Sequence, residues 1–184
     1  MRALFVLIII GLSVSADAQK LYGTVNSGGT TGTGTIFKVN SDGTGFTKIH
    51  DFVATTPGED PNTAQLTEGT PGNLYGLTVF GGVFWWGTLY EYNYVTKSYR
   101  LLHSFSFEDG GNPTSGVTYA SNGKLYGTGA VYAANTGKFG NIFEYDLATN
   151  EFKVVHEFVV DQGTITYGKL VEYNGKMRRP QWQH

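Results

Sequence analysis

Apolar and polar residues alternate along much of the chain in short runs. In residues 98–105, for example, Tyr99, Leu101 and His103 occupy every second position, with Arg100 between the first two. A period of two places neighbouring side chains on opposite faces of a β-strand. After the first eighteen residues, no stretch combines helical periodicity with capping residues. The pattern therefore predicts an all-β fold.

The middle of the chain contains four such strands in a row, at 73–78, 88–92, 98–105 and 116–119. The last of them is followed by Asn122-Gly123, which is the strongest short hairpin signal in a sequence, and then by the strand that begins at Leu125. We therefore expect a hairpin to join each four-stranded unit to the next unit along the chain.

The unit is an internal repeat. The motif Gly-Thr/Asn-Ile/Leu-Phe/Tyr begins at Gly34, Gly87 and Gly140, which gives the same interval of 53 residues twice. Other positions recur in or close to this register: His50, His103 and His156, and the Leu-Tyr-Gly triplets that contain Tyr22, Tyr75 and Tyr126. Residues shared by all copies are typical of structural positions in a repeat array. We divide the repeats at 19–73, 74–124 and 125–177, with an aperiodic tail at 178–184.

Tandem four-stranded units of about 40–50 residues are typical of β-propeller blades, with kelch repeats closest in length. A β-solenoid is less suitable, because its coils are shorter. Propellers have about 4 to 8 blades, so three predicted four-stranded blades form an incomplete or open ring. The last strand, 169–173, could close that ring by pairing with the strand at Leu21. Otherwise we expect a fragment of a larger protein, or self-association that completes the ring.

The first eighteen residues have the features of a secretory signal peptide. Arg2 precedes the apolar run 3–12, and Ala16-Asp17-Ala18 forms an A-x-A cleavage site. The run is too short for a transmembrane helix, which needs about 17–25 apolar residues. We therefore predict export to the periplasm, the cell surface or the medium, with no membrane span in the mature chain.

Charge and composition exclude several classes of function. The chain has 13 Lys and Arg against 15 Asp and Glu, so it lacks the basic field of a nucleic-acid-binding protein. It contains no Cys, which excludes disulfides, thiol nucleophiles and thiolate metal sites. The Gly-rich segment 28–34 lacks the Gly-Lys-Ser/Thr of a phosphate-binding loop and is read as a turn. We predict no cofactor.

The repeats also resemble a known family. Leu21-Tyr22-Gly23-Thr24 and Gly34-Thr35-Ile36-Phe37 match in order and spacing the GloVer tandem-repeat proteins, which are exported bacterial proteins regarded as propeller-like. The resemblance extends from Leu21 to about Met177 and implies a propeller-type fold and an extracytoplasmic location. The tail 178–184 departs from the family pattern, and the resemblance implies no catalytic residues.

An unusual aromatic stretch lies between the first two strands of the middle repeat. Phe84, Trp85 and Trp86 stand where the other repeats have 31–33 and 137–139. Loop aromatics often anchor recognition, so the stretch is a candidate platform for a sugar ring or a partner protein. Packing against a neighbouring blade is the alternative interpretation.

The loops after the third strands carry acidic and amide residues. Glu108, Asp109 and Asn112 occupy this loop in the middle repeat; the first repeat has Glu59-Asp60 and Asn62 there, and the last has Asp161 and Gln162. Carboxylate and amide groups could bind calcium or a sugar hydroxyl, although the lack of D-x-D-x-D spacing favours solvated turns. The three repeated His residues are interpreted as structural, with a metal site on the ring axis as the alternative.

No catalytic motif such as G-x-S-x-G or H-E-x-x-H is present. We therefore predict a binding or scaffold module for carbohydrate or protein and no catalytic residues. One alternative is a fragment of a larger propeller glycoside hydrolase or lyase, which would need carboxylates from several blades to converge in one cleft. Another is a fragment without a function of its own.

Overall fold

The computed structural model describes residues 19–53, 58, 60–61, 65–133, 137–159 and 168–178. The predicted signal peptide and nearly all of the tail lie outside these residues. Within them there is no helix, and thus none long and apolar enough to cross a membrane.

The described residues form thirteen strands: β1 (Lys20–Val25), β2 (Thr35–Asn40), β3 (Thr47–Asp51), β4 (Thr67–Glu68), β5 (Asn73–Thr78), β6 (Thr88–Asn93), β7 (Ser98–Ser104), β8 (Thr118–Tyr119), β9 (Lys124–Ala133), β10 (Lys138–Asp146), β11 (Glu151–Glu157), β12 (Val171–Tyr173) and β13 (Lys176–Arg178). The prediction of an all-β fold is confirmed.

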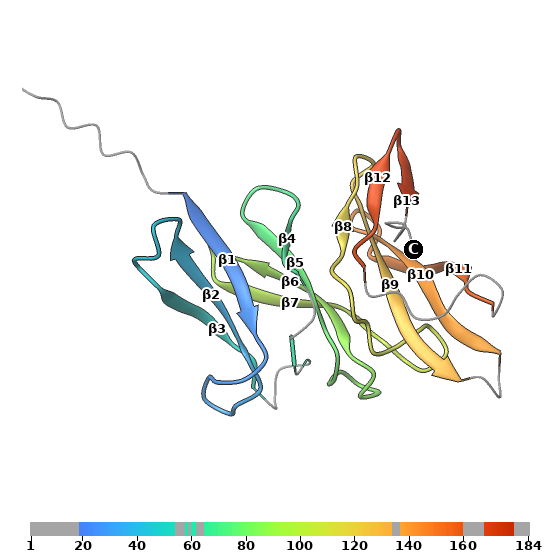
Figure 1. Cartoon of the computed structure of the whole chain (residues 1–184), viewed down its shortest axis with the longest axis horizontal. Coiled ribbons are helices and arrows are strands. Elements are labelled where there is room, and N and C mark those ends of the chain that lie inside the picture. The colour runs from blue at the N-terminus through green and yellow to red at the C-terminus, as the bar shows by residue number, and fades with distance from the viewer. Residues whose placement is uncertain are drawn as a thin grey trace, which may run out of the picture.

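The strands form four antiparallel sheets, which follow one another along the chain and lie side by side (Figure 1). Two sheets have four strands, in the orders β4-β5-β6-β7 and β11-β10-β9-β8; the flanking sheets are β1-β2-β3 and β12-β13. Three four-stranded blades are thus not found among the described residues, and no sheet closes on itself. The expected pairing of 169–173 with the Leu21 strand is wrong, because β12 pairs with β13 instead.

The predicted hairpins between repeats are confirmed. β4 pairs with β5, β8 with β9 and β12 with β13, and the registers Thr67↔Tyr75 and Thr118↔Tyr126 are equivalent. The fourth strand of each sequence repeat therefore becomes the first strand of the next sheet. The side chain of Thr67 donates a hydrogen bond to the carbonyl of Val117, just before β8, and that of Thr118 donates to the carbonyl of Leu170, just before β12.

The geometry of the sheets explains the Leu-Tyr-Gly triplet. In each copy the glycine lies opposite an aromatic residue of the neighbouring strand, as in the pair Gly76↔Tyr90. A Cβ atom at Gly23, Gly76 or Gly127 would lie within 2.5 Å of that ring or its hydroxyl. Only glycine leaves room for the aromatic side chain to cross the strand, and this explains why the triplet recurs.

The cores lie between neighbouring sheets. Ile36, Phe52, Leu74, Tyr90 and Tyr92 are buried between the first sheet and the second. A larger cluster lies between the second and third sheets, and consists of Tyr75, Leu77, Leu89, Phe105, Val117, Leu125, Phe143 and Tyr145. The first and second sheets thus each bury an apolar face against the next sheet along the chain, and this arrangement leaves the connecting loops at the edges accessible.

Two of the three repeated histidines, His50 and His103, lie at these junctions, whereas His156 is exposed on β11. The ring of His50 stacks on Tyr99 of the second repeat, with centroids 4.9 Å apart and planes at 7°. The ring of His103 stacks in the same way on Phe152 of the third repeat, at 3.7 Å and 3°. Burial lowers the pKa of His50, which favours the neutral ring in this apolar setting.

Candidate functional site

The most distinctive surface is the loop between β5 and β6, residues 79–87, which we call the aromatic loop. Its backbone is fixed by two hydrogen bonds: the amide of Gly87 donates to the carbonyl of Gly81 at 3.1 Å, and the amide of Val83 donates to Ser104 Oγ at 2.7 Å. Gly81 and Gly82 both adopt positive φ, at 83° and 78°. The loop is therefore a tight, internally bonded turn.

The apolar side chains of this loop divide into an outward and an inward group. Val83, Phe84 and Trp85 are 73%, 57% and 64% exposed, and Phe80 is also exposed. Trp86 is half-buried, packs against the core of the second and third sheets, and makes an edge contact with Phe107 at 5.6 Å. The platform interpretation therefore applies to Phe84 and Trp85, and the packing interpretation to Trp86.

The first repeat contains a loop of the same shape, residues 26–34, which we call the threonine loop. The amide of Gly34 donates to the carbonyl of Gly28 at 3.2 Å, as Gly87 does to Gly81. Trp85, at φ 65°, occupies the position of Gly32, at φ 81°. This left-handed region favours glycine and is unfavourable for a bulky side chain, by about 1–3 kcal/mol. The backbone of the loop thus requires no tryptophan at this position.

The predicted acidic residues lie on an adjoining loop, which follows β7. Asp109 is held inside it: one carboxylate oxygen is 2.9 Å from His103 Nε2, and the other accepts from the amide of Ser106 at 2.6 Å. Asn112, at φ 51°, donates its side-chain amide to the carbonyl of Val79 at 2.9 Å. These two residues therefore shape the loop, whereas Glu108 is exposed.

The two loops are in direct contact. The amide of Asn112 donates to the carbonyl of Trp86 at 2.6 Å, and a Cβ atom at Gly111 would lie 2.5 Å from that of Trp86. The six predicted binding residues, Phe84, Trp85, Trp86, Glu108, Asp109 and Asn112, are thus brought together at one end of the second sheet. Phe80 and Val83 join them on the surface; the signal for these two was their apolar character in a loop that is polar in the first repeat.

The acidic loops of different repeats do not correspond as the sequence suggested. Asp60 and Asn112 each precede a proline, have φ of 57° and 51°, and donate their amides to the equivalent residues Thr33 and Trp86. Asp60 therefore matches Asn112 and not Asp109. Glu59, Asn62, Asp161 and Gln162 lie outside the described residues.

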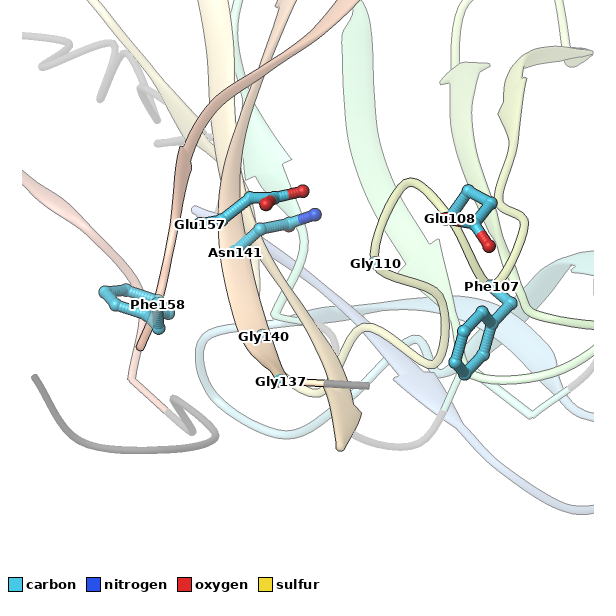
Figure 2. A pocket seen from close by; sticks show the side chains of 8 residues that line it. All are labelled: Phe107, Glu108, Gly110, Gly137, Gly140, Asn141, Glu157 and Phe158. Carbon is cyan, nitrogen blue, oxygen red and sulfur yellow. The ribbon is translucent and has the colours of Figure 1, made fainter. Parts of the chain in front are cut away.

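A small cavity separates the loop after β7 from the third sheet (Figure 2). It encloses about 20 Å³ and is lined by Phe107, Glu108, Gly110, Gly137, Gly140, Asn141, Glu157 and Phe158. Glu108 and Glu157 reach it from neighbouring sheets, as the glycoside hydrolase alternative would require. The space admits about one water molecule, however, and a sugar ring does not fit.

Among the described residues, no three His, Asp or Glu side chains gather in a way that could hold a metal ion. His50 and His103 lie at different junctions, and each is engaged by the aromatic ring of the next repeat. The metal alternative for the histidines therefore has no geometric support in these residues.

Comparison with known proteins assigns the chain to a family. No curated protein matches it. A solved structure, the crystal structure of a nidogen/laminin complex, is similar over 75% of this chain and 61% of that chain, with 18% identity and a TM-score of 0.38. This chain thus spans less than two thirds of the length of that chain. The family described as the Gloeobacter/Verrucomicrobia repeat matches residues 9–178, nearly the whole sequence. The protein therefore belongs to the Gloeobacter/Verrucomicrobia repeat family, in agreement with the resemblance of its Leu-Tyr-Gly and Gly-Thr-Ile-Phe motifs.

Proposed function

We propose that the protein is an exported, propeller-type binding module that contacts a carbohydrate or protein ligand through the aromatic loop. The observation that carries the proposal is Trp85. It is 64% exposed in a backbone conformation for which the first repeat uses Gly32. A residue that is unfavourable for the fold and exposed to solvent is best explained by a contact outside the chain.

The surroundings of Trp85 suit such a contact. Phe80, Val83 and Phe84 extend the apolar surface around it, and Glu108 on the adjoining loop is an exposed carboxylate. Tryptophan and other aromatic residues contribute a large share of binding energy at interfaces, and a flat ring also suits the face of a sugar. The hydrogen bonds to Gly81 and Ser104 hold the loop in place, so little conformational entropy is lost on binding.

The enzyme alternative has weaker support. Glu108 and Glu157 line one cavity, but that cavity holds about one water molecule. Glycoside hydrolases place their two carboxyl groups on either side of a bound sugar ring. The size of this cavity therefore argues against sugar hydrolysis between these two carboxylates.

The test compares the aromatic loop with the threonine loop. In the variant V83T/F84T/W85G, three residues take the identities found in the first repeat, while Trp86 keeps its core contacts. The full chain, expressed with its own N-terminal segment, is assayed by depletion on insoluble cellulose, chitin and xylan and on a glycan array. N-terminal sequencing of the product tests the predicted cleavage before Gln19.

We expect the wild-type protein to bind at least one of these glycans and the triple variant to bind at least about tenfold more weakly, or about 1.4 kcal/mol. The control W86A should lose stability through its lost packing. Equal binding by the wild-type protein and the triple variant would rule out the aromatic loop as the contact surface. If no glycan binds, a carbohydrate ligand is ruled out and only a protein ligand remains under the proposal.

Self-association is a second candidate role, and it rests on Phe46. Its equivalents Tyr99 and Phe152 stack on the histidine of the preceding repeat, whereas Phe46 stacks on Phe37 of its own repeat and is 66% exposed. In a second copy of the chain, the face of the third sheet that carries His156 would supply the matching surface. Light scattering should then show an oligomer that F46D converts to monomer and V95D, at another exposed apolar residue, does not. A wild-type monomer at every concentration would refute this role.

A further inference from the structure

A second surface feature lies away from the aromatic loop, in a cleft between the first sheet (β1-β2-β3) and the second (β4-β5-β6-β7). The cleft encloses about 170 Å³. It is lined by Tyr22, Lys38, Thr47, Lys48, Ile49, Tyr92, Tyr94 and Lys97. Three tyrosines and three lysines thus surround one hollow, although they come from four separate stretches of the chain.

The aromatic wall of the cleft is held in place by contacts within the protein. The rings of Tyr22 and Tyr94 stack with centroids 4.9 Å apart and planes at 25°. The hydroxyl of Tyr92 donates to the carbonyl of Ile49 at 2.7 Å, and that of Tyr94 donates to Glu68 Oε1 at 2.8 Å. The stack of Tyr22 on Tyr94 and the bond from Tyr92 to Ile49 link the two sheets, and the bond to Glu68 fixes Tyr94 within the second sheet. The rings are therefore already positioned before any ligand arrives.

The lysines differ in how their charge is balanced. Lys48 forms an ion pair with Asp51 at 2.7 Å. Among the described residues, the ammonium groups of Lys38 and Lys97 form no ion pair or hydrogen bond. The acidic Glu68 contacts this wall by accepting the hydrogen bond from the hydroxyl of Tyr94. The cleft therefore carries two positive charges that the protein itself does not neutralise.

The next junction along the chain shows what the repeat has at the same positions. There, Glu91, Arg100 and Asn150 replace Lys38, Thr47 and Lys97: the strand pairs Lys38↔Thr47 and Glu91↔Arg100 are equivalent, and Lys97 and Asn150 share a φ of 59°. Arg100 bonds Glu91 at 3.1 and 3.2 Å and Asn150 at 3.0 Å. At that junction the charges of Arg100 and Glu91 balance each other, whereas Lys38 and Lys97 give the first junction a positive charge.

We propose that the cleft between the first and second sheets binds an acidic sugar residue, a ring that carries a carboxylate or sulfate group. Lys38 and Lys97 would contact the anionic group, since ammonium groups bind anions through charge and hydrogen bonds. The tyrosine wall would lie against the ring. Pockets for drug-sized ligands are about 300–1,000 Å³, so a cleft of about 170 Å³ suits a single ring. The site is separate from the aromatic loop and does not depend on the ligand of that loop.

Calorimetric titration of the full chain tests the proposal with three probes: a trimer of galacturonic acid, a neutral trimer of galactose, and sodium sulfate. We expect the acidic trimer to bind at least about tenfold more tightly than the neutral one, a difference of about 1.4 kcal/mol. Its affinity should fall as NaCl rises from about 0.05 M to about 0.5 M, because the charges are exposed.

Three variants make the test specific. K38Q/K97N removes the two charges, and K38E/T47R/K97N installs the residues of the second junction; both should weaken binding of the acidic trimer at least about tenfold. K176Q, on the distant β12-β13 hairpin, and V83T/F84T/W85G should leave it unchanged. Circular dichroism of each variant confirms that it is folded.

The proposal is overturned if the acidic trimer does not bind, if K38Q/K97N binds it as tightly as the wild-type protein does, or if the neutral trimer binds equally well. Sulfate that binds as tightly as the acidic trimer would show that the cleft recognises a bare anion, and this result would overturn the contact with the sugar ring.

Discussion

The aromatic loop and the threonine loop have nearly the same backbone and opposite surfaces. Both carry glycines of positive φ at two matched positions, 81 and 82 in one and 28 and 29 in the other. Both close through the same amide-to-carbonyl bond, made by Gly87 in one and Gly34 in the other. One presents threonines to solvent and the other presents Val83, Phe84 and Trp85. The comparison indicates that the repeat determines the shape of a loop and leaves its outer side chains available for function.

The largest effect should come from the glycine that the two loops share. A Cβ atom at Gly87 would lie 2.3 Å from the carbonyl oxygen of Thr78, and one at Gly34 would lie 2.6 Å from that of Val25. Both also have positive φ. We expect G34A and G87A each to destabilise the protein by more than about 2 kcal/mol in urea unfolding. A loss below about 0.5 kcal/mol at either site would show that the two loops are not built alike.

Smaller changes in stability, of opposite sign in the two loops, should follow from exchanging the residues that distinguish them. W85G should stabilise the protein by about 0.5–1 kcal/mol, because glycine adopts the left-handed backbone without strain. G32W should destabilise it by about 1 kcal/mol, since an added Cβ there meets no neighbouring atom and only the backbone term remains. Thermal unfolding measures both. A destabilised W85G would mean that Trp85 makes a packing contribution and would weaken the binding proposal.

The smallest expected effect is a difference between the two loops in how their stability depends on acidic pH. The threonine loop is anchored by Asp51, which accepts from Thr30 Oγ1 at 2.9 Å and from Lys48 Nζ at 2.7 Å. The hydrogen bond from Lys48 lowers the pKa of Asp51. The aromatic loop has the uncharged Ser104 at this position.

Because the folded-state pKa of Asp51 lies below its unfolded value, its stabilising contribution is present above the unfolded pKa, about 3.9, and is lost as the pH falls through the folded value. Amide exchange in residues 28–34 should therefore accelerate as the pH is lowered below about 4, once the intrinsic pH dependence is subtracted. Residues 81–87 should respond less, and D51N should remove the difference between the loops. Equal responses of both loops would exclude Asp51 as the cause.

Much of the fold could be predicted because its signals are local. The strand at 98–105 shows its period directly, and Asn122-Gly123 marks a hairpin that the structure contains. The grouping of strands into sheets could not be predicted as well, since the choice of β13 over β1 as the partner of β12 depends on contacts between distant segments. The stacking of His50 on Tyr99 depends on such contacts too.

The candidate sites show the same limit. The aromatic loop stood out in the sequence, but the opposite directions of Trp85 and Trp86 follow from the positive φ of the first residue, which sequence does not display. Lys38 and Lys97 are unremarkable singly and meet only when two sheets pack. Aligning the repeats would have drawn attention to Lys38, because the other copies have Glu91 and Glu144 at this position. Glu91 pairs with Arg100, and Glu144 lies opposite Lys153.

The offset between sequence repeat and sheet has an evolutionary consequence. Each sheet receives its first strand from the preceding repeat, and Thr67 and Thr118 bond across to the following sheet segment. A gene duplication that copies any 53 consecutive residues of the array would therefore insert one complete sheet, already joined to both neighbours, wherever its breakpoints fall. The number of units could then change in a single event without any new interface having to arise, while mutations in the loops of one copy would be free to give it a different ligand.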